Sequence, residues 1–304
     1  MSAGDPPSPP VHPPSPRLPF LAVAEAAAAP ATAPAPAGDD VLLDVRDVWQ
    51  KLGGNQILEG VTLQVIDRVR PGQVTGQVVA LLGPSGVGKT RLIRLIAGLD
   101  PPDRGHICGV RACALPAGSV GVVFQSYPLL RHHTVLGNMM VAGIANGLAR
   151  EEAKTKAMSL LKRFGLDQRA DFFPAKLSGG QRQRVAIAQQ LMRQKQLLLM
   201  DEPFSGLDPA ALDDVIKLMV EVANMDELNT IVVVTHDIRS ALIASDTVFM
   251  LGRERAADGR ITSGARIKHH YDLVAKGLAW RPGIEREPQF RELEAEVKEH
   301  FRSL

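Results

Sequence analysis

The chain has 304 residues, of which 45% are hydrophobic, and a formal net charge of +2 at pH 7. This length and composition suffice for one large or two smaller soluble domains with a sizeable core. The near-neutral charge, without a long block of Lys and Arg, gives no support for binding to nucleic acid, which we do not expect as a partner. No apolar run approaches the ~20 residues that a membrane-spanning helix needs, so work at a membrane would require another chain to cross it.

Proline and alanine dominate residues 1–38, with Pro-Pro pairs at 6–7, 9–10 and 13–14. Such a stretch has too few apolar side chains to offset the entropy lost on ordering, so we expect a disordered or polyproline-like tail. A cleavable targeting segment is disfavoured, because Glu25 interrupts the apolar stretch from Phe20 to Ala29.

Strand-like alternation begins at Val41, and short apolar runs then recur between longer segments of helical periodicity. These runs cover residues 78–82, 120–124, 197–200, 231–234 and 248–251. Strands that alternate with helices predict an α/β fold with a mostly parallel sheet covered on both faces. Ligands of such folds bind at the carboxyl ends of the strands.

Two segments read as helices without strands of their own. Between Gln125 and Ser178 no buried strand is apparent, and one apolar face predicts a helix over residues 150–164, within a helical insert: Ala153, Ala157, Leu160, Leu161 and Phe164. A second apolar stripe, with Glu294 and Lys298 as an i,i+4 pair, predicts a docking helix near the end of the chain: Phe290, Leu293, Val297 and Phe301.

The chain contains two cysteines, Cys108 and Cys113. A zinc site needs about four ligands, and of the histidines only His106 lies nearby, so a metal site is disfavoured. We expect two free thiols in a reducing compartment rather than a disulfide.

The segment Gly83-Pro84-Ser85-Gly86-Val87-Gly88-Lys89-Thr90 matches the P-loop pattern G-x-x-x-x-G-K-[ST], between a predicted buried strand and a predicted helix. The glycines let backbone N–H groups turn toward phosphates, and a helix N-terminus adds partial positive charge. Lys89 would neutralise the β and γ oxygens, and the Thr90 hydroxyl would ligate Mg²⁺. The loop therefore predicts binding of a nucleoside triphosphate.

A second glycine-rich loop and a pair of carboxylates follow. Leu177-Ser178-Gly179-Gly180-Gln181 opens a helix, and the apolar run 197–200 ends at Asp201 and Glu202. Asp201 is placed to hold a metal ion, and Glu202 to polarise a water for attack on the γ-phosphate. A kinase needs no such water, so the pair favours hydrolysis of the triphosphate.

With the P-loop, Leu177–Gln181 and Asp201-Glu202-Pro203 in this order, the sequence resembles the ATP-binding subunit of ATP-binding-cassette (ABC) transporters of the importer type, over roughly residues 41–252. The resemblance implies an α/β P-loop NTPase cassette with a mostly parallel sheet, an N-terminal antiparallel β part and a helical subdomain. We accordingly expect a cassette over 39–265, with its helical subdomain at about 126–190, and a C-terminal helical extension over 266–304.

The resemblance also carries roles onto single residues. Trp49 falls where the family stacks an aromatic ring on adenine, and His236 matches the switch histidine that contacts the γ-phosphate. Gln125 matches the Q-loop glutamine, which contacts Mg²⁺ and reports to the membrane subunit. Residues 205–208 resemble the D-loop, which crosses to the opposite subunit.

The predicted site has three sets of residues. The catalytic set is Lys89, Gln125, Glu202 and His236. The nucleotide-binding set is Trp49, Gly83, Pro84, Ser85, Gly86, Val87, Gly88, Lys89, Thr90, Arg91, Ser178, Gly180 and Gln181, and the metal-binding set is Thr90, Gln125 and Asp201.

The sequence departs from the family pattern at two positions. Arg91 follows Thr90 where members commonly carry a second hydroxyl residue. Gln189 replaces an arginine on the helix after Leu177–Gln181, which matches the family's signature loop. Both changes bear on rate or coupling more than on activity, since the residues predicted to carry out hydrolysis are present.

The resemblance implies an ATP hydrolase that uses ATP and Mg²⁺ and powers solute transport from the cytoplasmic face of the inner membrane. Its expected partners are a second cassette, paired head to tail in a homodimer, transmembrane permease subunits and an extracytoplasmic solute-binding protein. The alternative is a soluble ABC ATPase of the translation or DNA-repair type. Translation members usually carry two cassettes, and repair members separate the P-loop from the signature loop by long coiled coils. This sequence shows one cassette and a short separation, so both types are disfavoured. A third class, a module that binds ATP without hydrolysis, is disfavoured because Lys89, Asp201, Glu202 and His236 are all present.

Overall fold

A computed structural model describes residues 41–67, 76–109, 113, 115–116, 118–192, 197–207, 209–224, 230–256, 258–261, 263–281 and 283–304. The predicted tail over 1–38 and Asp208 of the predicted D-loop lie outside these ranges. The described residues belong to one compact unit that covers residues 34–304.

The first two described strands and β4 form a three-stranded antiparallel sheet, as predicted for the N-terminal part. Its strand order is β2-β1-β4. The strands are β1 (Val41–Leu52), β2 (Asn55–Ile66) and β4 (Arg104–Gly109). One face is apolar and buried, with Leu43, Val45 and Val48 of β1 in the core, so the sheet must pack on another layer.

The second sheet has six strands in the order β5-β6-β7-β3-β8-β9. Its strands are β3 (Gln77–Leu82), β5 (Gly121–Val123), β6 (Leu197–Asp201), β7 (Thr230–Thr235), β8 (Thr247–Gly252) and β9 (Arg266–Asp272). Strands β5 to β8 and β3 run parallel, and β9 pairs antiparallel with β8. Every residue of β3, β6, β7 and β8 is buried, which confirms the prediction that the apolar runs form a mostly parallel sheet.

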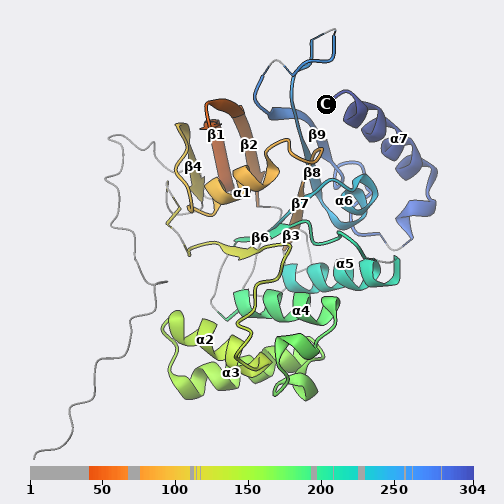
Figure 1. The fold of residues 1–304 in the computed structure, drawn as a ribbon. Helices are drawn as coiled ribbons and strands as arrows, with labels where there is room; N and C mark the ends of the chain where they lie inside the picture. The colour runs from red at the N-terminus through yellow and green to blue at the C-terminus, as the bar shows by residue number, and fades with distance from the viewer. Residues whose placement is uncertain are drawn as a thin grey trace, which may run out of the picture. The chain divides into compact units, whose positions relative to one another are not determined.

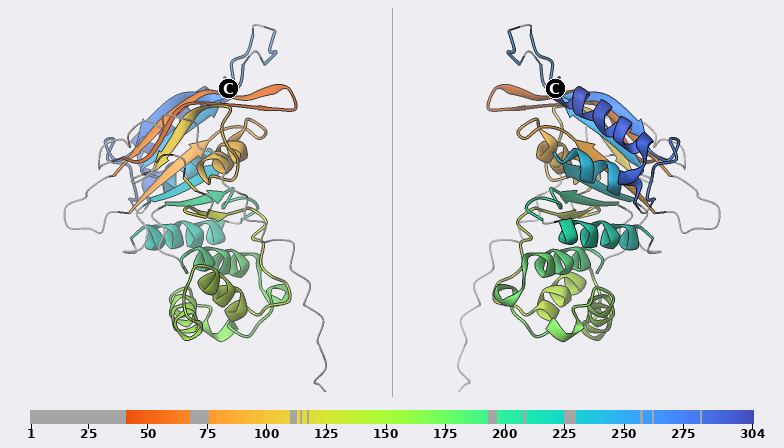
Figure 2. Two further views of the ribbon diagram at one scale, coloured as in Figure 1. Left: turned by 90° about the vertical axis from the view of Figure 1, so that its left-hand side faces the viewer. Right: turned by 90° about the vertical axis from the view of Figure 1, so that its right-hand side faces the viewer.

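Both faces of this sheet are covered, as Figures 1 and 2 show. On one face Val79 and Leu81 of β3 belong to a core shared with the three-stranded sheet and helix α1 (Lys89–Ile96). On the other face Val78 packs in a core with helix α5 (Pro209–Ala223) and the helical subdomain. Helix α6 (Ile238–Ala244) lies against the end of the sheet that carries β8.

Three helices between β5 and β6 form the predicted helical subdomain: α2 (Val135–Ala145), α3 (Arg150–Arg163) and α4 (Gly179–Gln190). Helix α3 buries Ala153, Ala157, Leu160 and Leu161, the stripe that predicted it. In Figure 1 these helices lie on the side of α5 away from the sheet.

The C-terminal segment needs one correction. Residues 266–304 were predicted to be a helical extension, yet Arg266–Asp272 forms strand β9 and completes the six-stranded sheet. Its half-buried, polar sequence, with two adjacent histidines, lacks the apolar run that marked the other strands. Helix α7 (Pro288–Arg302) is present as predicted, with Phe290, Leu293 and Val297 buried and Glu294 2.6 Å from Lys298.

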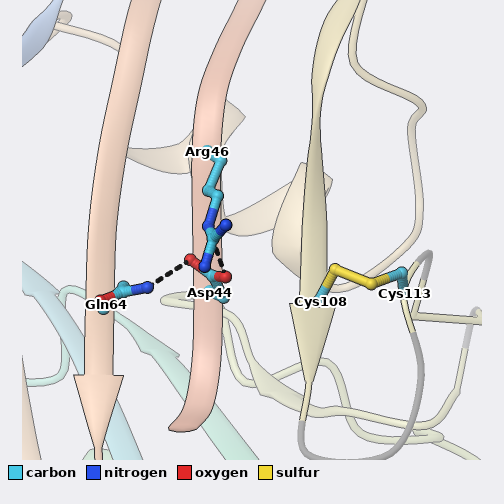
Figure 3. The surroundings of a disulfide bond; sticks show 5 residues. All are labelled: Asp44, Arg46, Gln64, Cys108 and Cys113. Carbon is cyan, nitrogen blue, oxygen red and sulfur yellow. Dashed lines mark hydrogen bonds and ion pairs between the residues drawn. A yellow bond between two sulfur atoms is a disulfide. The ribbon is translucent and has the colours of Figure 1, made fainter. Parts of the chain in front are cut away.

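The prediction of two free thiols is wrong. Cys108 of β4 and Cys113 form a disulfide beside the Asp44–Arg46 ion pair of β1 (Figure 3). The two residues face each other in an antiparallel bridge with Cα atoms 3.8 Å apart. A low cysteine count could not reveal this pairing, because it depends on the local reversal of the chain.

Among the described residues, no helix is both long enough and apolar enough to cross a bilayer.

Candidate functional site

The parallel sheet brings three predicted segments to one edge. Strands β6, β7 and β3 are parallel neighbours, so their carboxyl ends lie side by side. The P-loop, Gly83–Thr90, follows β3, Asp201 ends β6, and His236 follows β7. The strand order thus places the histidine between the phosphate loop and the carboxylates.

Two glycines of the P-loop are required by their surroundings. A Cβ atom on Gly83 would lie 2.6 Å from the carbonyl oxygen of Leu251 at the end of β8. Gly88 has a φ of +120°, which disfavours any side chain, and a Cβ there would also meet Ile57 and Leu58 of β2 at 3.1 Å. The loop is therefore held between the two sheets and ends at the N-terminus of α1, where unpaired N–H groups favour phosphate.

Lys89 is buried, with 6% of its surface exposed. Its Nζ donates to the carbonyl oxygens of Gly83 (2.7 Å) and Pro84 (3.1 Å) and lies 3.5 Å from Glu202 Oε1. Burial lowers the pKa of Lys89, and the carboxylates of Glu202 and Asp201 oppose that shift. The ammonium group is thus held inside the phosphate loop.

Thr90 and Asp201 form a pair suited to a metal ion. Thr90 Oγ1 donates to Asp201 Oδ2 over 3.1 Å. Burial raises the pKa of Asp201, partly offset by this hydrogen bond, and its Oδ1 is buried without a hydrogen-bond partner in the described part of the chain. A buried carboxylate oxygen without a donor fits a hard cation such as Mg²⁺, which prefers oxygen ligands.

Glu202 adopts a left-handed backbone conformation, with a φ of 49°. That conformation is uncommon for a residue other than glycine and is found where the surroundings enforce it. Its N–H donates to the Val234 carbonyl (2.8 Å), and its Oε2 accepts from Thr235 Oγ1 (3.3 Å) and lies 2.9 Å from His236 Nδ1. The strained turn therefore aims the carboxylate at the last side chain of β7 and the one that follows it.

Gln125 lies two residues past β5, at the same edge of the sheet as Asp201, and is exposed. Among the described residues it makes no hydrogen bond. The structure thus places Gln125 at the sheet edge that carries Asp201, and no hydrogen bond within the described residues fixes its side chain.

The signature loop lies apart from these contacts, at the start of α4. Ser178 is the N-cap: its Oγ accepts from the Gln181 N–H (3.3 Å), and the Gln181 side chain accepts from the Ser178 N–H (3.0 Å). Ser178, Gly179 and Gly180 are exposed. The loop is an ordered helix N-terminus open to a ligand from outside the chain, while Gln181 is engaged in the cap.

Trp49 is not brought to the phosphate loop. Its Nε1 donates to Asp47 Oδ1 (2.6 Å), and the guanidinium of Arg104 lies 5.5 Å from the ring centroid. The next side chain, Gln50, points to the opposite face of the strand, where its Oε1 accepts from Arg91 of α1 (3.2 Å). None of the contacts of the Trp49 ring is with the phosphate loop, so its stacking on adenine stays a prediction.

The two departures from the family pattern have structural contacts. Arg91 bridges Gln50 and Asp100, with Nη1 3.2 Å from Asp100 Oδ2, so its side chain ties α1 to β1. Gln189 Nε2 donates to the carbonyl oxygen of Asn138 (3.0 Å) and joins α4 to α2. Neither of these side-chain contacts is with another residue of the predicted phosphate site.

Two residues at the site were absent from the predicted set. Thr235 donates to Glu202, and Arg253 donates to the P-loop carbonyl oxygens of Gly86 and Val87. Thr235 could have been found as the last residue of a buried run before His236. Arg253 gave no signal, because its importance depends on β8 lying next to β3.

Comparison with known proteins agrees with this geometry. The family model described as ABC transporter matches residues 69–205. The sulfate/thiosulfate import ATP-binding protein CysA of Bradyrhizobium diazoefficiens is 40% identical over 223 residues, which are 70% of this chain and 62% of that protein. The L-cystine import ATP-binding protein TcyC of Bacillus subtilis is 36% identical over 223 residues, 69% of this chain and 86% of that protein.

Solved structures show the same fold. The cbiO1 structure from Clostridium perfringens, part of the ABC transporter complex cbiONQ, matches with a TM-score of 0.64 and 27% identity, over 78% of this chain and 91% of that one. The dimeric structure of MJ0796, described as a bacterial ABC transporter cassette, matches with a TM-score of 0.61 and 27% identity, over 76% of this chain and 99% of that one.

Proposed function

This chain belongs to the ABC transporter family, and from that premise we propose that it is the ATP-hydrolysing subunit that powers solute transport through separate transmembrane subunits. The observation that carries the proposal is the position of Glu202. Its carboxylate lies 3.5 Å from the P-loop Lys89 and 2.9 Å from His236, at the edge where the phosphate loop begins.

Each residue of the cluster has a chemical task. Lys89 and the N–H groups at the start of α1 bind the phosphate oxygens and stabilise the charge of the transferring group. Glu202, held by Thr235 and His236, takes the proton of the attacking water. His236, with half of its side chain exposed, reaches from Glu202 toward the γ-phosphate. Positioning and electrostatics carry phosphoryl transfer, so no covalent intermediate on the protein is needed.

Mg²⁺ is the proposed metal. Thr90 and Asp201 would hold it, with Gln125 as a further oxygen ligand from the neighbouring strand end. When bound, the ion neutralises the charge that develops on the phosphate oxygens. The unpartnered Oδ1 of Asp201 supports this assignment.

Removal of the metal is expected to abolish ATP hydrolysis, and added Mg²⁺ is expected to restore it. Asp201→Asn keeps the volume of the side chain but removes its charge, so the Mg²⁺ concentration for half-maximal activity should rise about tenfold or more. Phosphate release measured across a Mg²⁺ titration tests this. Asp214→Asn, on the exposed face of α5, is the matched control and should titrate like the parental protein. Equal titrations for both variants would remove Asp201 from the metal site.

A second copy of the chain is the proposed partner for the signature loop. The exposed N-terminus of α4, with Ser178 and Gly180, would bind the phosphates of ATP held by the P-loop of that copy. Head-to-tail pairing would thus complete two sites at once, and the dimeric form of the related cassette MJ0796 supports it.

The other proposed partners are transmembrane permease subunits and, for an importer, an extracytoplasmic solute-binding protein. The chain would then lie at the cytoplasmic face of the membrane as a peripheral subunit. The names of CysA and TcyC, both import ATP-binding proteins, support this interpretation over a soluble ATPase of translation or repair. Because these two relatives act on different solutes at similar identity, the solute is assigned by the permease and not by this chain.

Capture of the tagged chain from detergent-solubilised membranes of its native source is expected to bring integral membrane subunits with it. In vesicles, the captured complex should take up solute only with ATP, and the Glu202→Gln variant should capture the same subunits without supporting uptake. Recovery of the chain wholly in the soluble fraction, on ribosomes or on DNA, would contradict the transport function and favour the alternative.

A further inference from the structure

The segment after β8 lies against the outside of the P-loop. Strand β8 is the parallel neighbour of β3, with Met250 opposite Leu82, so the chain leaves both strands at the same edge. The carbonyl oxygen of Leu251 lies close to Gly83. Two residues further on, Arg253 Nη2 donates to the carbonyl oxygens of Gly86 and Val87, both at 3.4 Å.

The charge of Arg253 is not neutralised by the described part of the chain. The adjacent carboxylate, Glu254, pairs with Lys268 instead. Arg253 forms no ion pair within the described ranges, and its Nε is buried there without a hydrogen-bond partner. A guanidinium group with only carbonyl oxygens as partners leaves its positive charge beside the loop that is to receive a polyanion.

The carbonyl groups of Gly86 and Val87, which accept from Arg253, belong to the peptide units that carry the N–H groups of Val87 and Gly88. The Val87 N–H closes a turn to the Pro84 carbonyl (3.3 Å), while the Gly88 N–H has no acceptor among the described residues. A cation that binds the carbonyl end of a peptide unit polarises it, which strengthens its N–H as a donor. The contact therefore fixes the turn and prepares a free N–H for phosphate.

We propose that Arg253 is a positioning residue for the nucleotide phosphates. It holds the P-loop from the side opposite to the ligand and adds a positive charge close to the bound nucleotide. The inference rests on the proposed binding of ATP. Because Arg253 contacts the loop backbone and neither Glu202 nor His236, it should affect nucleotide affinity and leave the chemical step unchanged.

Arg253→Ala is expected to raise the KM for ATP and the Kd for ADP about tenfold, with kcat unchanged, since one charge-assisted contact to the loop is lost. Arg253→Lys, which keeps the charge, should recover part of the affinity, and Arg253→Gln, which keeps donors without charge, should recover less. Arg260→Ala removes the same charge from the same β8–β9 segment at an exposed position and should leave KM unchanged. Steady-state kinetics and calorimetric titration with ADP measure these values, and unfolding without nucleotide checks that each variant is folded.

The inference would be overturned if Arg253→Ala had the same KM for ATP as the parental protein. A fall in kcat at unchanged KM would overturn it as well. If Arg253→Ala does not fold, Arg253→Lys and Arg253→Gln decide: equal affinities for the two would show that the charge has no part. If the parental protein binds no nucleotide, the proposed function itself is refuted. If the parental protein and the Arg253→Ala variant bind nucleotide equally well, only the inference about Arg253 fails.

Discussion

Glu202→Gln is expected to slow ATP hydrolysis by a factor of about 10²–10⁴, the range lost when a positioned general base is removed. The amide keeps the size of the side chain and can still accept from Thr235, so the site should keep its shape. ATP binding should persist, because Lys89 and the P-loop are untouched. The variant should therefore accumulate as an ATP-bound dimer. Phosphate release and light scattering with and without ATP measure the two effects.

Glu221→Gln on α5 makes the same chemical change at an exposed ion pair with Arg163 and is the control for the loss of one carboxylate. It should hydrolyse ATP at the parental rate and dimerise only transiently. If Glu202→Gln also hydrolyses ATP at the parental rate, Glu202 is not the base. The strained backbone at this residue would then need another explanation.

Lys89→Met is expected to weaken ATP binding about 10- to 150-fold, since charge-assisted hydrogen bonds are worth about 1.5–3 kcal/mol. Hydrolysis at saturating ATP should fall by a further factor of about 10²–10³, because the ammonium also stabilises the charge of the transition state. Fluorescent-nucleotide titration and steady-state kinetics separate the two effects.

The matched control is Lys298→Met on α7, where the ammonium pairs with Glu294 on the surface. This variant should bind and hydrolyse ATP like the parental protein. Unchanged ATP affinity in Lys89→Met would show that the buried ammonium serves only the carbonyl oxygens of its own loop.

The core of the fold was predictable because it depends on local signals. Runs such as 231–234 are apolar enough to read as strands buried on both faces, and the chemistry-bearing residues follow them directly. Parallel strands then bring Lys89, Asp201 and His236 to one edge without further information. The prediction was accurate where a residue's neighbours follow from its place at a strand end.

Features that depend on lateral neighbours could not be predicted. Strand β9 is antiparallel and partly exposed, so no apolar run marks Arg266–Asp272. The disulfide of Cys108 depends on its antiparallel pairing with Cys113. Arg253 becomes part of the site only because β8 lies beside β3. The order of strands in a sheet cannot be predicted from the sequence of any one segment.

The capping box at Ser178 has a consequence for how fast two copies can come together. The Ser178 Oγ accepts a hydrogen bond to make the cap, which leaves its own proton free to donate. An incoming phosphate can therefore be bound without breaking the cap or ordering the loop. The conformational entropy of this loop is lost when the monomer folds and not when two copies associate. Association of the two copies should therefore resemble the docking of rigid bodies.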